Sequence, residues 1–466
     1  MARVNSCNKI LDNINHSSVD RFGNFKIKIM NARQNLFYNK KFLIYGFGKS
    51  GFSAFKYLNQ KNDCKIIDDN QKNVPFKYRE KTLDYKQLKK NSFDYIVLSP
   101  GIDINKCKLS KYLKKNRSKV ITELDIFYLS YPKIKKITIT GTNGKSTTSK
   151  ILFDVLKAHK KDVRLTGNIG NPVLLERKIK KNTIFIIEAS SYQLDYSKFF
   201  RSDYSLILNL HPDHLERHGN FKNYVKAKFK LLQSQSKKNY AFIEKQNNIL
   251  NYLIKKNKIK SKIYRVNYNK YQKYTKLINN RYFNNKSNIK NLSFVFALSK
   301  FLKLRLRKII ETTNKFKGLN FRQQIIYDSK KLMIINDSKS TSLSSTELLL
   351  ESFENIYWIL GGLAKKGDQL KLNRKYFGKI NAFIYGKDKI FFSKILKKKI
   401  KYKISKSLNN SLLLIFKDIK KNFDGKKVIL FSPSAASFDQ FKNFEDRGKY
   451  FNKIIINYIK KYRVIG

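Results

Sequence analysis

The sequence is poor in several residue types, and each shortage limits what the chain can be. Its 466 residues include only 3 cysteines, Cys7, Cys64 and Cys107, whose spacing matches no metal motif and which cannot all pair. We therefore expect a reducing compartment, the cytoplasm, rather than a disulfide framework. No apolar run approaches the roughly 20 residues that a membrane helix needs, so we expect no membrane insertion.

Acidic residues are also scarce, with 33 Asp and Glu against 99 Lys and Arg and a formal net charge of +66. Such a charge favours polyanionic partners. However, the lysines are spread along the whole chain together with Asn, Ile, Tyr and Phe, which share A/T-rich codons, while Gly and Pro are sparse. We attribute most of the charge to genome composition and expect nonspecific nucleic-acid adhesion. A basic nucleic-acid-binding protein remains an alternative.

Hydrophobic residues make up 41% of the chain, enough to fill several cores. Short β-rich runs alternate with helical stretches, which predicts an α/β fold with parallel sheets. Three such series predict a Rossmann-like domain at 37–130, a central P-loop-type domain with a mostly parallel sheet at 131–318, and a Rossmann-like domain at 319–466. The stretch 1–36 lacks the apolar segment of a secretory signal, and we expect a poorly ordered extension there.

A first glycine loop, GFGKSG at 46–51, lies between a predicted strand and a predicted helix. This is the G-x-G-x-x-G pattern of dinucleotide-binding folds, and Asp68 follows about 20 residues later, at the end of the next strand. The loop therefore predicts that this part of the chain binds a nucleotide. Taken alone it favours an NAD-dependent oxidoreductase with Asp68 on the ribose, although nothing downstream resembles hydride chemistry.

A second loop, TITGTNGKSTTSK at 138–150, resembles a P-loop but has Ile139 where G-x-x-x-x-G-K-[ST] requires its first glycine. The backbone amides at 142–144 can surround a polyphosphate at the start of the following helix. Lys145 supplies a positive charge for the β- and γ-phosphates, and the Ser146 hydroxyl suits Mg²⁺. This loop predicts ATP or GTP binding.

Two polar residues stand at the ends of neighbouring predicted strands. Glu188 ends TIFIIE, and His214 follows SLILNLHPD. Each alone is more often a structural polar residue, but with Ser146 nearby the pair predicts a metal beside the phosphates. Other acids of this region remain alternatives: Asp195, Asp203, Asp213 and Glu216.

These motifs resemble those of the Mur ligases, which add amino acids to the UDP-linked cell-wall precursor. The resemblance runs from about Lys41 to the C-terminus and includes TGTNGKST, NIGNP (168–172), EASSYQLD (188–195), HPDHLERHG (211–219), YVKAK (224–228), FKGLNFR (316–322), NDSKST (336–341) and GGLAKKGD (361–368). The segment SPSAASFDQFKNFEDRG at 432–448 is similar to that of the members that add D-glutamate. The DNPR segment of the diaminopimelate-adding members is absent from the sequence.

The resemblance implies an ATP-dependent amide ligase. It would join D-glutamate to the alanine carboxylate of UDP-N-acetylmuramoyl-L-alanine through an acyl phosphate, in peptidoglycan precursor synthesis, and would act as a monomer. The alternative within the family is a ligase for another amino acid.

The resemblance also implies residue roles. The catalytic residues are Lys145, Glu188, His214, Lys228 and Arg322. The ATP-binding residues are Gly141, Thr142, Asn143, Gly144, Lys145, Ser146, Thr147, Asn291, Arg322 and Asp337. The UDP-substrate residues are Gly48, Lys49, Ser50, Asp68, Asp69, Ser99, Gly101, Asn168, Ser190 and Lys339, and the D-glutamate residues are Thr341, Lys365, Ser437 and Phe444. Two Mg²⁺ sites would use Ser146, Glu188, His214 and Lys228, the last as a carbamylated lysine.

The sequence departs from the family pattern at five positions, Ser287, Asn320, Phe321, Ser342 and Ala435. They stand where the family has His, Pro, His, Asn and Cys. The departures affect details of the adenine and interdomain contacts, whereas the predicted metal and phosphate residues are intact.

Overall fold

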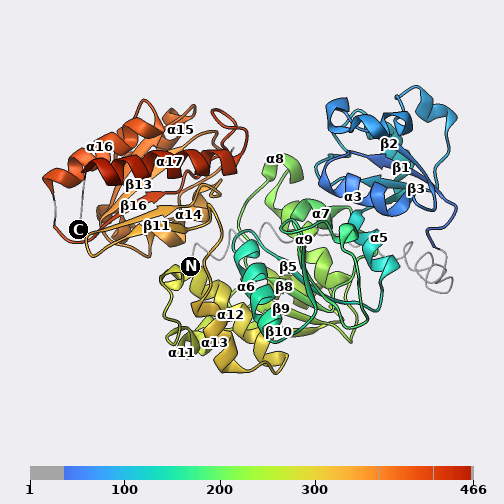
Figure 1. The fold of residues 1–466 in the computed structure, drawn as a ribbon, viewed down its shortest axis with the longest axis horizontal. Helices are drawn as coiled ribbons and strands as arrows, with labels where there is room; N and C mark the ends of the chain where they lie inside the picture. The colour runs from blue at the N-terminus through green and yellow to red at the C-terminus, as the bar shows by residue number, and fades with distance from the viewer. Residues whose placement is uncertain (1–35, 366, 423, 463–466) are drawn as a thin grey trace. The chain divides into compact units, whose positions relative to one another are not determined.

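The computed structural model describes residues 36–365, 367–422 and 424–462, so the extension predicted over 1–36 lies outside the described residues except for its last position. One compact unit comprises the described residues up to Leu210 together with His214–Arg265. The second comprises His211–Asp213 together with the described residues from Val266 onward. These units contain three β-sheets whose strands alternate with helices along the chain (Figure 1), which confirms the predicted α/β fold class.

The first sheet has four parallel strands in the order β2-β1-β3-β4. Its strands are β1 (Lys41–Tyr45), β2 (Asp63–Ile67), β3 (Tyr95–Leu98) and β4 (Val120–Ile121). The helices are α3 (Lys49–Leu58), α4 (Ser110–Lys115) and α5 (Glu123–Ser130), with short 3₁₀ turns η2 (Gln71–Asn73), η3 (Phe76–Lys81), η4 (Gln87–Lys90) and η5 (Arg117–Lys119). Four of the five β1 residues are buried, as in a strand covered on both faces.

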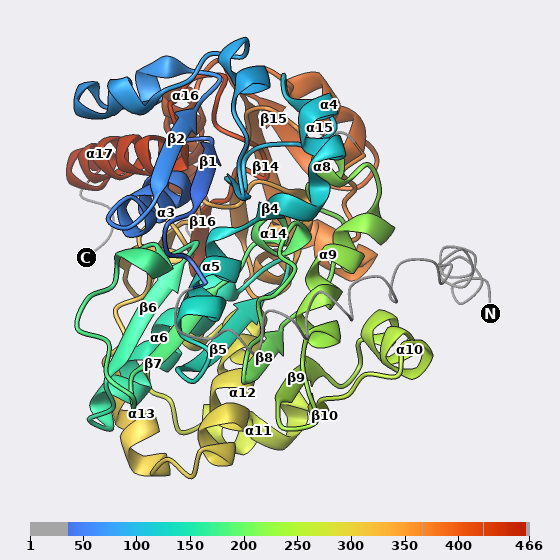
Figure 2. The ribbon, with the colours of Figure 1, turned by 90° about the vertical axis from the view of Figure 1, so that its right-hand side faces the viewer.

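The second sheet, also in the first unit, has the order β10-β9-β8-β5-β7-β6 (Figure 2). Its strands are β5 (Lys135–Thr140), β6 (Val163–Gly167), β7 (Ile184–Glu188), β8 (Tyr204–Ile207), β9 (Tyr240–Glu244) and β10 (Lys262–Val266). The helices are α6 (Lys145–Ala158), α7 (Ser191–Asp195), α8 (Leu215–His218), α9 (Phe221–Gln233) and α10 (Asn248–Lys256), with the turn η6 (Val173–Leu175). Because β5 pairs in parallel with both β7 and β8, the loops that follow these three strands meet at one edge.

A buried carboxylate joins the two halves of the first unit. Asp125, on α5, accepts hydrogen bonds through Oδ1 from the Ser197 hydroxyl (2.7 Å) and from the amides of Lys198 (3.0 Å), Phe199 (2.7 Å) and Phe200 (2.9 Å). These four residues precede β8 of the second sheet. The first and second sheets are therefore tied together by one fully buried side chain.

The second unit begins with α11 (Tyr268–Thr275), η7 (Arg281–Phe283), α12 (Lys286–Phe301) and α13 (Leu306–Asn314). Its sheet has the order β11-β12-β16-β13-β14-β15, in which β11 alone is antiparallel to its neighbour. The strands are β11 (Gln324–Asp328), β12 (Leu332–Asn336), β13 (Ile356–Gly361), β14 (Ile380–Tyr385), β15 (Lys401–Ile404) and β16 (Lys427–Phe431). The remaining helices are α14 (Leu343–Leu350), η8 (Arg374–Lys379), α15 (Lys389–Leu396), α16 (Leu408–Lys421) and α17 (Phe444–Tyr462).

Alternate residues of β12 show how this sheet is covered. Met333 and Ile335 belong to the cluster that includes α14 and α15, whereas Leu332 and Ile334 belong to the cluster that includes α16 and α17. Since successive strand side chains point to opposite faces, helices cover both sides of the sheet. This is the Rossmann-like arrangement predicted for the C-terminal part, with an antiparallel edge strand added. None of the helices over the described residues combines the length and apolar character needed to cross a bilayer.

Candidate active site

The loop after β5 explains the missing P-loop glycine. Ile139 is fully buried inside β5, so the strand continues to Thr140 and the loop is shorter than the usual motif requires. Its two glycines occupy conformations that favour glycine: Gly141 has φ +152° and Gly144, the N-cap of α6, has φ +84°. The loop therefore enters a helix N-terminus directly, where backbone N–H groups favour anions.

Asn209, which sequence reasoning missed, holds this loop. The Thr142 amide donates to the Asn209 carbonyl (3.0 Å), and the Asn143 amide donates to Asn209 Oδ1 (2.8 Å). In return, Asn209 Nδ2 donates to the Asn143 carbonyl (3.1 Å). Lys145 is folded over the loop, and its Nζ donates to the carbonyls of Gly141 (2.9 Å) and Thr142 (2.8 Å). In this conformation two of the three predicted phosphate-binding amides, those of Thr142 and Asn143, are thus engaged within the protein.

Two oxygen atoms beside the loop fit a divalent cation. Ser146 and Glu188 are only 2% and 1% exposed. Their atoms Ser146 Oγ and Glu188 Oε2 are buried and have no hydrogen-bond partner among the described residues. Glu188 Oε1 accepts from Asn168 Nδ2 (2.8 Å), which fixes the carboxylate. Since buried polar atoms are normally hydrogen-bonded, such a hydroxyl and carboxylate are suited to Mg²⁺. The strand pairing of Glu188 with Ile139 places the carboxylate next to the loop.

Lys228 contacts the loop directly, whereas His214 lies among residues of α7 and α8. Lys228 lies on α9, is 2% exposed, and its Nζ donates to the Gly141 carbonyl (2.9 Å) and contacts Thr140 Oγ1 at 3.3 Å. His214 Nδ1 is 2.9 Å from the Tyr192 hydroxyl and 3.5 Å from Glu216 Oε1. Tyr192 was not identified from the sequence, although it lies within EASSYQLD.

The structure places two of the four alternative metal-binding acids, Asp203 and Asp195, away from the loop. Asp203 lies before β8, and its Oδ2 accepts from the Lys136 amide at the start of β5 (2.8 Å), so it stands at the sheet edge opposite the loop. Asp195 ends α7 and lines a separate pocket. Over the described residues there is no group of three His, Cys, Asp or Glu that could hold a metal. A metal here would therefore need Ser146 and other donors besides Glu188 and His214.

The first glycine loop is built around close backbone contacts. A Cβ on Gly51 would lie 1.8 Å from the Gly46 carbonyl oxygen, so α3 can approach β1 only with glycine there. The Ser99 hydroxyl donates to the same carbonyl (2.6 Å). By contrast, a Cβ on Gly48 or Gly101 would meet no atom within 4 Å, so both backbones border open space. Lys49 and Ser50 begin α3 directly after Gly48.

Asp68 and Asp69 have structural partners. Asp68 Oδ2 accepts from the Phe47 amide of the glycine loop (2.6 Å), and its Oδ1 accepts from the Asn70 amide (2.8 Å). Asp69 Oδ1 accepts from the hydroxyls of Tyr45 (2.9 Å) and Tyr85 (2.7 Å). Asp68 therefore braces the loop, a role that the ribose prediction did not include.

Within the second unit, predicted residues gather around the start of α17. Lys339 Nζ lies 3.9 Å from the centre of the Phe444 ring, and the Arg322 guanidinium lies 6.0 Å from it. Asp337 is buried, and its Oδ1 and Oδ2 accept from the Gln323 amide (3.0 Å) and the Ser432 hydroxyl (3.0 Å). Burial raises the pKa of Asp337 to about 7. The structure brings these side chains to one end of the sheet.

The other predicted residues of this unit are more dispersed. Asn291 is buried on α12, where its Nδ2 contacts Asn288 Oδ1 (3.4 Å). Thr341 precedes α14, Lys365 follows β13, and Ser437 is buried in the loop after β16. In the first unit, Ser190 caps α7, with its hydroxyl accepting from the Gln193 amide (3.2 Å), and Thr147 is buried in the first turn of α6.

Arg447 is a further residue that sequence reasoning missed, although it lies in the 432–448 segment. It is almost fully buried, and its Nη2 donates to the carbonyls of Ser338 (2.7 Å) and Ala435 (3.0 Å). It thereby joins the loops after β12 and β16. Ala435 contacts Arg447 through its backbone carbonyl, an acceptor that any residue at this position would offer. Of the other departures, Phe321 has φ +60°, and a Cβ on Gly448 would lie 2.3 Å from its ring, whereas Ser342 is the N-cap of α14.

Together, a glycine loop on the first sheet and a shortened P-loop on the second define a nucleotide-binding α/β protein. The model of the Mur ligase middle domain matches residues 139–307. The UDP-N-acetylmuramoylalanine–D-glutamate ligase of Rickettsia bellii is 32% identical over 437 residues, covering 88% of this chain and 96% of that protein. The chain therefore belongs to the Mur ligase family, and within it to the UDP-N-acetylmuramoylalanine–D-glutamate ligases.

Solved structures agree on the fold. The chain is similar to MurF from Acinetobacter baumannii, with a TM-score of 0.55 at 15% identity, covering 72% of this chain and 79% of that one. It is also similar to MurF from Thermotoga maritima in complex with ADP, with a TM-score of 0.52 at 14% identity, covering 90% and 96% of the two chains. At such identities these likenesses concern the fold alone.

Proposed function

We propose that this chain joins D-glutamate to the alanine carboxylate of UDP-N-acetylmuramoyl-L-alanine, converting ATP to ADP and phosphate. The observation that carries the proposal is the similarity, over nearly its whole length, to a ligase named for this reaction, in a chain that keeps the P-loop residues. The ADP complex of a protein of the same fold supports ATP as the energy source. The comparisons favour this ligase over an NAD-dependent oxidoreductase and over a nucleic-acid-binding protein.

A carboxylate is a poor electrophile, so the reaction needs an activated acyl group. In the proposed first step an oxygen of the alanine carboxylate attacks the γ-phosphorus of ATP, and the bond to the β-phosphate oxygen breaks to release ADP. The amine of D-glutamate then attacks the acyl phosphate carbon, loses a proton, and phosphate leaves as the amide forms. Lys145 and Arg322 are proposed to neutralise charge on the transferred group, and such positioning is most of phosphoryl-transfer catalysis.

Mg²⁺, when bound, supplies positive charge that neutralises the phosphate oxygens and orients them. The residues proposed to hold two such ions are Ser146, Glu188, His214 and Lys228. The orphaned Ser146 Oγ and Glu188 Oε2 support the first site.

A carbamylated Lys228 is proposed for the second site, because an ammonium would repel a cation whereas a carbamate is an oxygen ligand. Carbamylation joins the lysine amine to CO₂ and releases a proton. NMR of protein equilibrated with ¹³CO₂ would show a carbamate signal that is lost in Lys228→Met and kept in the exposed-site control Lys238→Met.

The remaining roles follow the resemblance. The proposed UDP-substrate and D-glutamate residues are those named from the sequence, with Gly48 and Gly101 supported by their open surroundings. We also propose that the protein is a monomer and acts in the cytoplasm. Light scattering coupled to size exclusion tests the oligomeric state.

The test of the function is phosphate release from ATP in the presence of Mg²⁺ and UDP-N-acetylmuramoyl-L-alanine. D-glutamate should support release, whereas L-glutamate and meso-diaminopimelate should not. Release with another amino acid in place of D-glutamate would keep the ligase but contradict its specificity.

A further inference from the structure

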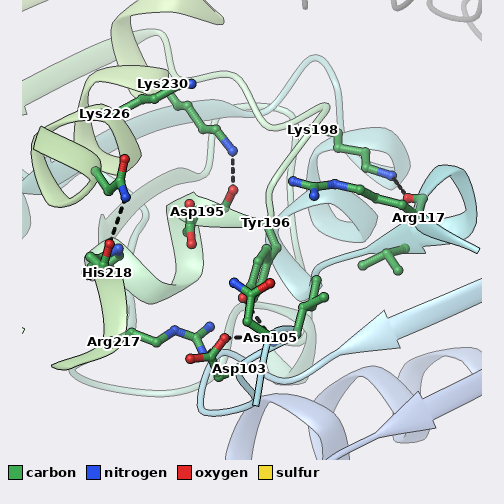
Figure 3. A pocket seen from close by; sticks show the side chains of 13 residues that line it. Asp103, Asn105, Arg117, Asp195, Tyr196, Lys198, Arg217, His218, Lys226 and Lys230 are labelled. Carbon is green, nitrogen blue, oxygen red and sulfur yellow. Dashed lines mark hydrogen bonds and ion pairs between the residues drawn. The ribbon is translucent and has the colours of Figure 1, made fainter. Parts of the chain in front are cut away.

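A pocket of about 670 Å³ lies within the first unit, away from both glycine loops. Its walls come from the segment after β3, from the residues that lead into β4, and from α7, α8 and α9 (Figure 3). Five cationic side chains line it, Arg117, Lys198, Arg217, Lys226 and Lys230, against two carboxylates, Asp103 and Asp195. Its volume is typical of a small-molecule site rather than of a single-ion site.

Arg217 is the most informative residue of this lining. Its side chain is 7% exposed, and neither Nη1 nor Nη2 has a hydrogen-bond partner among the described residues. The nearest carboxylate oxygen, Asp103 Oδ1, is 3.6 Å from Nη1 (Figure 3). The guanidinium lies 5.3 Å and 5.1 Å from the ring centres of Tyr192 and Tyr196, which hold it in place. Buried donors are normally hydrogen-bonded, so the two unsatisfied guanidinium nitrogens of Arg217 are available to a ligand.

Two half-buried lysines of the pocket donate to backbone carbonyls rather than to carboxylates. Lys198 Nζ donates to the carbonyls of Arg117 (2.5 Å) and Ser118 (3.1 Å), and Lys230 Nζ donates to the Asp195 carbonyl. Burial lowers the pKa of Lys198 to about 8. A bound anion would offset this cost, since an opposite charge favours the charged form of lysine.

The pocket is distinct from the proposed ATP site. Lys228, which contacts the P-loop, lies between Lys226 and Lys230 on α9. Residues two apart on a helix do not share a face, so the pocket lysines point away from the side that holds the loop. The composition of the chain does not explain the cluster either. A strongly basic chain exposes its cationic side chains to water, whereas the Arg217 side chain is largely buried.

We propose that this pocket is a third anion-binding site, besides the two nucleotide sites, which takes a small molecule carrying a phosphate or pyrophosphate group. Arg217 would donate to two phosphate oxygens through its planar guanidinium, and Lys226, at the exposed end of the lining, would add a second positive charge. The site is additional to the proposed UDP and ATP sites and does not take part in the proposed reaction.

Calorimetry with inorganic pyrophosphate tests the site in the full-length protein. Saturating UDP and a non-hydrolysable ATP analogue with Mg²⁺ are present throughout, so that the two nucleotide sites are filled. Under these conditions we expect one remaining site. Arg217→Met should weaken it about tenfold or more, the effect of losing charge-assisted hydrogen bonds. Since the assay requires no turnover, its outcome is independent of the proposed ligase activity.

Lys226→Met keeps the test decisive if Arg217→Met does not fold, because Lys226 is exposed and its replacement leaves the buried contacts intact. The matched control is Lys238→Met, an exposed lysine outside the pocket. Weakening by the pocket variants and not by Lys238→Met would support the proposal. Absence of a third site, or equal effects of Lys226→Met and Lys238→Met, would overturn it.

Discussion

Replacing Asp125 by alanine should loosen the connection between the first two sheets. Its Oδ1 accepts four hydrogen bonds from Ser197–Phe200, and its Oδ2 accepts two from the amide and hydroxyl of Thr122, both at 3.0 Å. Removing a buried charged acceptor that leaves several N–H groups unsatisfied costs about 3–5 kcal/mol. Asp154→Ala is the matched control, since Asp154 pairs with Lys150 one helical turn away, an interaction that contributes about 0.3–0.5 kcal/mol.

Hydrogen exchange read by mass spectrometry localises this effect. In Asp125→Ala, amides at 198–200 should exchange about 100-fold faster or more, which corresponds to roughly 3 kcal/mol. Peptides from the second unit should exchange as in the wild type. Exchange at 198–200 within a few-fold of that in Asp154→Ala would refute the reasoning, because Asp125 would then contribute no more than a surface pair.

Four further predictions concern other parts of the chain. Gly51→Ala should destabilise the first unit by more than about 3 kcal/mol in urea unfolding, since its Cβ would lie 1.8 Å from a carbonyl oxygen. Gly48→Ala should fold normally but weaken UDP binding measured by calorimetry. Glu188→Gln should weaken Mg²⁺-dependent ATP binding without lowering the unfolding midpoint, because the amide oxygen can still accept from Asn168. Burial raises the pKa of Asp337 from 3.8 to about 7, so the folded state holds its proton more tightly than the unfolded state does. The stabilisation from this proton is therefore complete below about pH 4 and is lost as the pH rises through 7. Asp337→Asn should therefore flatten the fall in stability between about pH 4 and pH 8, followed by the fluorescence of the single tryptophan, Trp358, which is buried in the second unit.

The sequence was sufficient to predict the alternation of strands and helices, because buried parallel strands read as apolar runs that end in polar residues. It also located both glycine loops, since only glycine fits positions such as Gly51 and Gly144. The residues that support those loops were missed. Asn209 contacts Asn143 across 66 positions, and Asp125 contacts Phe200 across 75 positions. Neither belongs to a local pattern, so only the folded chain reveals their roles.

Asp68 illustrates a different limit. Its spacing from the glycine loop predicts a contact with a bound nucleotide, and this stays a prediction. The spacing did not reveal that its oxygens also accept from the backbone amides of Phe47 and Asn70 and so brace the loop. The same holds for Arg447, whose place in a family segment gave no sign that it ties two loops together.

The central claim, an ATP-dependent ligase that uses D-glutamate, is tested most directly by phosphate release from ATP with Mg²⁺ and UDP-N-acetylmuramoyl-L-alanine. We predict release with D-glutamate and none with L-glutamate or without an amino acid. Lys145→Ala should abolish release, whereas Lys238→Ala, at an exposed position away from the loop, should match the wild type. Absence of release from folded protein that binds ATP, or release that persists in Lys145→Ala, would contradict the account.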